Sequence, residues 1–391
     1  MSAGSRFAEI AAWGLFTDEH RRLREGVREY VERALAPNAE KWEEAGEFPI
    51  REVFPEAGAV GLFGAKFEEE YGGSGPDLVA DAIVTEELAR CGSAGVAASL
   101  GAHKDLGSWY LHRFGTEEQR ERWLVPAIAG SAITALAVTE PDAGSDVAGI
   151  RTRAERDGDD WVLHGSKAFI TNGTVADVVV VAARTQPGEG HDGISLIAVE
   201  RDTPGFTSSR IETLGWRTSQ TGELAFDAAR VPAANLLGEE GKGFLHLMEG
   251  FAWERLSMAL GAVSGAERTL QLGIDYAKER QAFGRPVARF QVWRHRFADL
   301  ATEIEAARSL TYHALRTVVA GEDAVREASM AKWLATELSW RVADEALQVH
   351  GGYGFMMEYP VQRAWRDSRL GPIGGGTTEI MKEIIGRSYG L

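Results

Sequence analysis

Residues 244–279 read FLHLMEGFAWERLSMALGAVSGAERTLQLGIDYAKE, and the first residues beyond them that can stop a helix are Gly284 and Pro286. So long a stretch without proline predicts one long helix. Further helices are predicted at 290–320, at 323–350 and after Thr377. Because the connections between them are short, residues 237–391 are expected to form a four-helix bundle.

Short apolar runs precede this bundle, and turn residues such as Asn172-Gly173 and Pro204-Gly205 separate them. The runs are 133–138, 161–163, 178–183, 194–199 and 224–226. Strand-length runs at this spacing predict a compact antiparallel β domain. We place it at residues 133–236.

Residues 1–132 are predicted to be helical. A stripe through Val27, Tyr30 and Val31 has helical spacing, with Thr17 as its cap and Pro37 at its end. Helices are also expected at 77–89 and 116–129, after a loop at 72–76. The fold class is therefore α+β and mostly helical, in three domains, and residues 1–14 are expected to be mobile.

The composition excludes several classes of protein. Among 391 residues, 58 are acidic and 42 basic, and the formal net charge of −16 argues against a nucleic-acid or anionic-membrane surface. Cys91 is the single cysteine, which excludes a disulfide framework. The longest apolar run, 178–183, is too short to span a membrane, and the N-terminus lacks a signal-peptide pattern. We expect a cytoplasmic protein.

Common catalytic motifs are missing. None of the nine histidines follows an acidic residue by three positions, so the di-iron motif of helix bundles is absent and we expect no metal. There is no GxSxG nucleophile motif. Residues 188–193 match GxGxxG, but a strand follows them instead of a helix, so we interpret them as a hairpin loop.

Four segments combine glycines with aromatic, hydroxyl or arginine side chains. They are VTEPDAGSD (138–146), GSKAFITNG (165–173), RQAFG (280–284, with Gln291 beyond it) and QVHGGYG (348–354). Glycine lets the backbone approach a ligand closely, aromatic rings pack on flat groups, and arginine forms forked hydrogen bonds with phosphate. Together these residue types suit a flat, phosphate-bearing ligand.

These four segments, in this order and spacing, resemble the acyl-CoA dehydrogenase family of flavoproteins from about Leu15 to the C-terminus. The resemblance implies noncovalent FAD and a homotetramer. It assigns flavin contacts within the chain to Leu136, Val138, Thr139, Ser145, Phe169, Thr171, Thr377 and Glu379. It assigns contacts with the diphosphate and adenine of a neighbouring subunit's FAD to Arg280, Phe283, Gln291, Gln348 and Gly352.

The resemblance also implies a reaction. In this family a carboxylate removes the α proton of an acyl-CoA thioester while the β hydrogen leaves as hydride, and the electrons pass to an electron-transfer flavoprotein. Many members place the base where this chain has Gly375. Isovaleryl- and long-chain-type members place it on the long helix before an arginine, which here is Glu254 before Arg255. We therefore predict Glu254 as the base.

The same resemblance implies substrate contacts at Ser145, Arg255 and Gly375. The backbone amide of Gly375 is expected to donate to the thioester oxygen, where negative charge develops. For Arg255, a contact with the CoA part of the substrate and a structural ion pair both remain open. The missing side chain at Gly375 is expected to leave space for a branched or long acyl chain.

Three other functions remain open at this point. The substrate acyl group could be tethered to an acyl carrier protein instead of CoA. The fold also serves flavin monooxygenases or oxidases, which would activate oxygen, although a monooxygenase needs no α-proton base. The third is a flavin-binding protein without catalytic activity, and Glu254 argues against that possibility.

Overall fold

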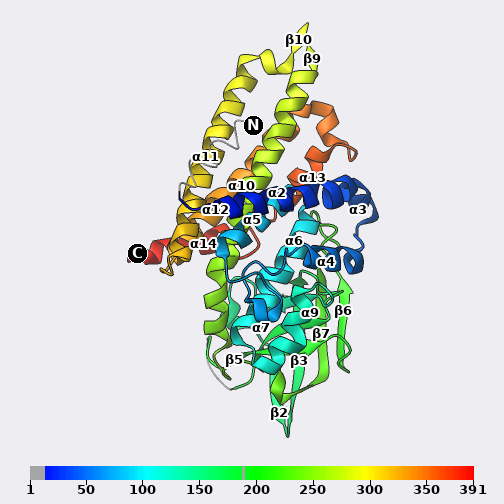
Figure 1. The fold of residues 1–391 in the computed structure, drawn as a ribbon, viewed down its shortest axis with the longest axis vertical. Helices are drawn as coiled ribbons and strands as arrows, with labels where there is room; N and C mark the ends of the chain where they lie inside the picture. The colour runs from blue at the N-terminus through cyan, green and yellow to red at the C-terminus, as the bar shows by residue number, and fades with distance from the viewer. Residues whose placement is uncertain (1–13, 187–189) are drawn as a thin grey trace.

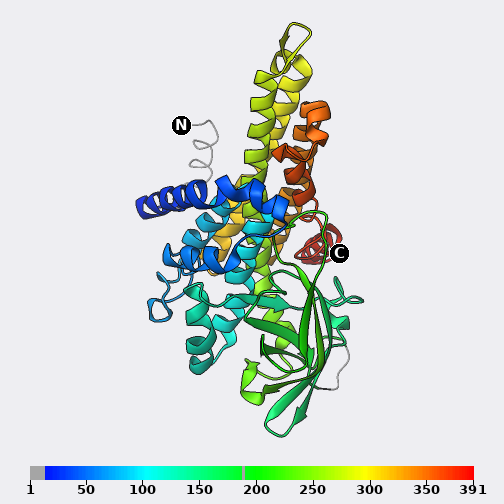
Figure 2. The same cartoon turned by 90° about the vertical axis from the view of Figure 1, so that its right-hand side faces the viewer.

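The structure is a computed structural model, which describes residues 14–186 and 190–391 (Figures 1 and 2). A β domain lies at one end, long C-terminal helices reach the other end, and N-terminal helices pack beside their middle. Most of the segment that we expect to be mobile, 1–14, is outside the described residues. Part of the predicted loop at 188–193 is also outside them; residues 190–193 form a turn.

The N-terminal part is helical, as predicted. Its α-helices are α2 (Asp18–Tyr30), α3 (Ala39–Ala45), α4 (Ile50–Ala59), α5 (Leu78–Leu88), α6 (Ala94–Ala102), α7 (Ser108–Phe114), α8 (Glu117–Gln119) and α9 (Val125–Ile128). The Thr17 side chain caps α2 by accepting from the backbone N–H of His20 at 3.2 Å. Between α6 and α7, the π-helical turn η4 (His103–Gly107) keeps the chain helical.

The middle part is one eight-stranded sheet in the order β6-β7-β3-β2-β4-β5-β8, with β1 beside β4. Its strands are β1 (Thr134–Ala137), β2 (Arg153–Asp157), β3 (Asp160–Ile170), β4 (Val178–Arg184), β5 (Ile194–Glu200), β6 (Phe206–Arg210), β7 (Gly222–Pro232) and β8 (Leu236–Leu237). Most pairs are antiparallel, but β4 runs parallel to β1 and β2. The expectation of an antiparallel domain is wrong at these pairs: β3 runs opposite to β2, and the chain then turns again before β4, so β4 runs in the direction of β1 and β2.

Apolar runs did not predict β2 and β6. In β2 only Ala154 is buried, and no residue of β6 is fully buried. Both strands pair through their backbones, β2 with β3 and β6 with β7. Strands whose side chains face solvent lack the apolar signal that marks a strand in a sequence.

The C-terminal part has five helices. They are α10 (Gly243–Glu279), α11 (Gln291–Val319), α12 (Val325–His350), α13 (Pro360–Ser368) and α14 (Thr378–Ser388). The sequence predicted four of these and missed α13, in which Pro360 occupies the first turn, a position that tolerates proline. A small hairpin of β9 (Gln281–Ala282) and β10 (Arg285–Pro286) forms the tip between α10 and α11 (Figure 1).

Buried apolar side chains form three clusters. One joins the N-terminal helices to the sheet, one lies among α5, α10, α11 and α12, and the third joins α7 and α10 to the other sheet face. Helix α10 contributes to the last two clusters, so its packing fixes the long helices against the rest of the chain. In the described part of the chain, no helix is long and apolar enough to cross a membrane.

Candidate active site

Glu254 and Gly375 lie next to each other, although 121 positions separate them in the sequence. Glu254 is on α10, and Gly375 is on the loop that precedes α14. A Cβ atom at position 375 would stand 3.4 Å from Oε1 of Glu254. The two positions that sequence reasoning considered for the base therefore meet at one place.

The structure corrects the expectation of free volume at Gly375. A Cβ atom there would stand 2.5 Å from Sδ of Met258, which is closer than packed atoms approach. Met258 lies one helical turn after Glu254, so its thioether fills the space that a larger residue at 375 would need. The backbone of Gly375 also has a φ of 61°, which disfavours any side chain.

The Glu254 carboxylate is only partly exposed and has no close partner. Among the residues that the structure describes, none forms a hydrogen bond or an ion pair with it. Burial raises the pKa of Glu254 to about 7, the positive charges of Arg255 and Lys332 act in the opposite sense, and Asp105 adds to the rise. A carboxyl group with this pKa exchanges its proton near neutral pH.

A buried cluster of two lysines and two aspartates supports the helix on which Glu254 lies. Lys66 and Lys104 both pair with Asp81 and with Asp105, and all four are at most 6% exposed. The two ammonium groups outweigh the effect of burial and hold the pKa of Asp105 far below its usual range. A neutral, fully paired set of charges is the arrangement that a protein interior tolerates.

Asp105 connects this cluster to α10. Its carboxylate accepts from Nε1 of Trp253 at 3.1 Å and from Oγ of Ser257 at 2.9 Å. Trp253 and Ser257 are one helical turn apart and flank Glu254 in the sequence, so the two bonds fix the rotation of the helix at that point. Sequence reasoning missed Asp105; the available signal was a Lys-Asp pair within an otherwise apolar helical stretch.

Lys332 is a further buried charged residue near Glu254. It lies on α12 with no exposed surface, and its Nζ donates to the carbonyl oxygen of Gly376 at 2.5 Å. Burial lowers the pKa of Lys332 to about 8, and the negative charge of Glu254 counteracts this. Sequence reasoning missed this residue too, since a lone lysine on an amphipathic helix normally indicates a solvated face.

Arg255 is almost fully buried beside Glu254. Its guanidinium lies over the ring of Phe251, 5.6 Å from the centroid, and its Nε has no hydrogen-bond partner in the described part of the chain. No ion pair of Arg255 within 4.0 Å occurs there either. A buried guanidinium with an unused donor is suited to an acceptor that the protein itself does not supply.

The segment 138–146 leaves β1 and is fixed to β3. The Lys167 ammonium, completely buried, donates to the carbonyl of Val138 and to Oε1 of Glu140, both at 2.8 Å. The backbone N–H of Ala168 donates to the Thr139 carbonyl at 2.9 Å. These bonds hold the loop, so that Ser145 at its far end is exposed while Leu136 and Val138 lie mostly inside.

Phe169 has an unusual backbone conformation and an exposed ring. Its φ is 61° and its side chain is 65% exposed, at a point where the pairing of β3 with β7 shifts register. A left-handed backbone costs a bulky residue roughly 1–2 kcal/mol, and such strain is typical of functional positions. Thr171 follows it, half-buried, and the predicted residues Thr377 and Glu379 begin α14 beside Gly375.

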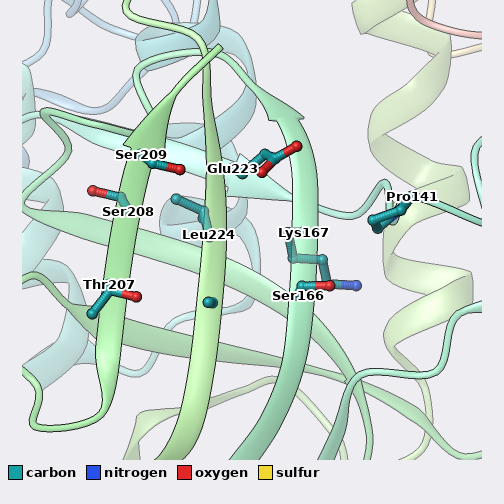
Figure 3. A pocket seen from close by; sticks show the side chains of 9 residues that line it. Pro141, Ser166, Lys167, Thr207, Ser208, Ser209, Glu223 and Leu224 are labelled. Carbon is teal, nitrogen blue, oxygen red and sulfur yellow. The ribbon is translucent and has the colours of Figure 1, made fainter.

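A shallow hollow of about 190 Å³ adjoins this loop (Figure 3). Strands β3, β6 and β7 form its floor, and Pro141 stands at its rim. Its lining combines apolar surface with polar side chains such as Ser166, Ser208 and Glu223. Glu254 is not among the residues that line it, so the hollow belongs to the surroundings of the loop.

The remaining predicted residues lie at the far end of the long helices. Arg280, Phe283, Gln291, Gln348 and Gly352 are all exposed, and Phe283 is 97% exposed. The tip formed by β9 and β10 points away from the β domain in both views (Figures 1 and 2). Within one chain, these five residues therefore lie away from the loop at 138–146.

Three family models match the chain in succession. They are the N-terminal domain of acyl-CoA dehydrogenase at residues 17–131, the middle domain at 135–229 and the C-terminal domain at 241–390. The mitochondrial long-chain specific acyl-CoA dehydrogenase of Sus scrofa is 42% identical over 388 residues, covering 98% of this chain and 90% of that protein.

Solved structures share the fold over nearly the whole chain. A glutaryl-CoA dehydrogenase of Mycobacterium smegmatis in complex with FADH2 has a TM-score of 0.90 and 32% identity, covering 96% of this chain and 95% of its own. A chain from a structure of the electron transferring flavoprotein of Acidaminococcus fermentans has a TM-score of 0.92 and 38% identity, covering 96% of this chain and 98% of its own.

The raised pKa of Glu254 predicts a pH-dependent cost in stability. A carboxyl whose pKa rises from 4.5 to about 7 on folding destabilises the fold increasingly as pH rises between these values. The free energy of unfolding of Glu254→Gln should therefore exceed that of wild type at pH 8 by up to ~3 kcal/mol, which raises the unfolding temperature, and should show no gain at pH 4. Thermal unfolding of both proteins at the two pH values measures this.

The matched control is Glu249→Gln on the same helix, where the carboxylate is exposed and pairs with Arg113. This variant should show no such gain at pH 8. Equal stability of Glu254→Gln and wild type at pH 8 would contradict a raised pKa in the folded protein.

Proposed function

Because this chain belongs to the acyl-CoA dehydrogenase family, we propose that it oxidises an acyl-CoA thioester to the trans-2-enoyl-CoA. The α carbon loses a proton to a carboxylate and the β carbon loses a hydride, so the substrate gives up two electrons. An electron-transfer flavoprotein then takes the electrons from the enzyme. The observation that carries the proposal is the unpaired, partly buried carboxylate of Glu254 beside Gly375.

The residues present fit FAD. An exposed aromatic ring at Phe169, held by a strained backbone, suits a flat ring system, and the fixed loop before Ser145 offers backbone and hydroxyl groups beside it. The residues that would hold the flavin in this chain are Leu136, Val138, Thr139, Ser145, Phe169, Thr171, Thr377 and Glu379. When bound, FAD supplies the two-electron acceptor for the β hydride.

We assign the α-proton base to Glu254. A substrate α carbon is a weak acid, so the base must be sheltered from water and must have a pKa near the working pH. Glu254 meets both requirements, because burial raises its pKa to about 7. The proton moves to a carboxylate oxygen of Glu254 as the C–H bond of the α carbon breaks.

The neighbours of Glu254 have separate functions in this proposal. The amide of Gly375 donates to the thioester oxygen while charge develops there. Arg255 offers its free Nε to the CoA side of the substrate, and Ser145 contacts the bound substrate as well as the flavin. The position of the base and the long-chain relative support a long or branched acyl group, a preference that does not rest on free volume because Met258 occupies that space.

We further propose a homotetramer in which each flavin site is completed by a neighbour. Arg280, Phe283, Gln291, Gln348 and Gly352 lie at or next to the ends of the long helices that point away from the β domain (Figures 1 and 2). Their exposure leaves them free to contact a second copy. The domain borders after 132 and 236 and a cytoplasmic location stay predictions.

Replacing the base should abolish turnover but spare binding. Glu254→Gln keeps the size and polarity of the side chain and loses its basicity, so the rate of flavin reduction should fall by at least ~10²-fold with little change in substrate affinity. Anaerobic stopped-flow bleaching of the flavin with acyl-CoAs of several lengths measures it. Glu249→Gln is the control, and wild-type speed in Glu254→Gln would refute the assignment.

Removing the distal arginine should deplete the flavin. Arg280→Ala deletes a guanidinium suited to a diphosphate, so the purified protein should contain less FAD per chain than wild type. Absorbance of the flavin relative to protein, measured beside size-exclusion with light scattering, is the assay. Arg289→Ala, an exposed arginine near the same tip, should retain full FAD. A wild-type monomer that holds FAD would contradict the shared site.

A further inference from the structure

Lys332 is the one side chain that connects α12 to the loop carrying Gly375 by a hydrogen bond to its backbone, within the described residues. Gly375 and Gly376 both have left-handed backbones, with φ values of 61° and 91°. Such a turn cannot satisfy its own carbonyls by regular pairing. The bond from Lys332 gives the partly buried carbonyl of Gly376 its partner, and an unpaired carbonyl there would be costly.

The amide of Gly375 is left free by this arrangement. Among the described residues it donates to no acceptor, whereas Gly374 on the same loop donates to the Leu370 carbonyl at 2.9 Å. The Gly376 carbonyl lies only two peptide units after the Gly375 amide, so a lysine that holds this carbonyl also restricts the short turn that carries the free amide.

Four charged groups surround the Lys332 ammonium. Glu254 and Arg255 face it from α10, Glu337 lies on its own helix, and Glu379 begins α14. Glu254 in turn experiences Arg255, Lys332 and, from η4, Asp105. Of the two cations near Glu254, only Lys332 also contacts the glycine loop, and it has no exposed surface, so solvent screens its charge little.

We propose that Lys332 is a positioning residue for α-proton removal: its hydrogen bond holds the Gly375 amide toward the substrate, and its buried positive charge stabilises the carboxylate form of Glu254. The proposal rests on Glu254 being the base. Lys332 itself touches neither substrate nor reacting atom. Lys332 neither gives nor takes a proton in this step, and only the Glu254 carboxylate gains one.

Two substitutions separate the two functions. Lys332→Gln keeps a donor for the Gly376 carbonyl but removes the charge, and Lys332→Met removes both. Losing a nearby positive charge raises the pKa of a carboxylate, so the rising limb of the pH profile of flavin reduction should move to higher pH in both variants, by about one unit. In Lys332→Met the plateau rate should also fall by ~10-fold or more, because the amide is no longer held.

The experiment is anaerobic stopped-flow reduction of the tetrameric, FAD-loaded enzyme by one acyl-CoA between pH 5.5 and 9. Lys382→Gln is the matched control, because Lys382 is an exposed lysine over the neighbouring Trp333, and its limb should not move. Lys332→Arg keeps both the positive charge and the hydrogen-bond donor, so its pH profile should rise at the same pH as that of wild type. This variant keeps the test decisive if Lys332→Met does not fold.

The outcomes distinguish this proposal from that of the base. If Glu254→Gln reduces its flavin at wild-type speed, the base assignment fails. Alternatively, Glu254→Gln is inactive while the pH profile of flavin reduction by Lys332→Gln rises at the same pH as that of wild type. That result overturns the effect of the Lys332 charge and leaves the assignment of Glu254 as the base intact. A Lys332→Met plateau equal to that of wild type overturns the positioning of the loop.

Discussion

An unpaired carboxylate between two long helices is the constraint on which the rest of the active region depends. Burying a charge without a partner costs free energy, and the protein meets that cost at Glu254 by letting the side chain hold its proton up to about pH 7. A paired Glu254 would be a stronger acid and a poorer base. The structure must therefore hold this helix firmly while leaving one of its side chains without a bond.

Two groups of contacts meet this requirement. The cluster around Asp105 takes hydrogen bonds from Trp253 and Ser257, which holds α10 and places negative charge nearby. Lys332 places positive charge near Glu254 and holds the loop with Gly375. Burial is the main cause of the raised pKa of Glu254, Arg255 and Lys332 oppose it, and Asp105 adds to it.

The sequence predicted the elements whose signal is local. The long helix with Glu254, the cap at Thr17 and the strands with apolar runs follow from spacing and from turn residues. The exposed strands β2 and β6 lack such runs, and the direction of β4 depends on a distant hairpin.

Within the active region, resemblance to a family indicated Glu254 and Gly375, whereas Asp105, Lys332 and Met258 emerged only from three-dimensional packing. Their contacts join elements far apart in the chain, such as η4 with α10 and α12 with the last loop. No periodicity reports which buried lysine faces which backbone carbonyl. Sequence reasoning therefore reached the proposed base, but could not have found the contacts of Asp105, Lys332 and Met258 around it.

The pKa of Glu254 itself is the most direct test. Infrared difference spectroscopy of the protein labelled with isotopically substituted glutamate, with the label signal of Glu254→Gln subtracted, reports the protonated carboxyl of this one residue across a pH titration. The account predicts a midpoint near pH 7. A midpoint near the ordinary glutamate value of 4.5 would contradict it, because the carboxylate would then be solvated or paired and the balance of charges around it would have no effect.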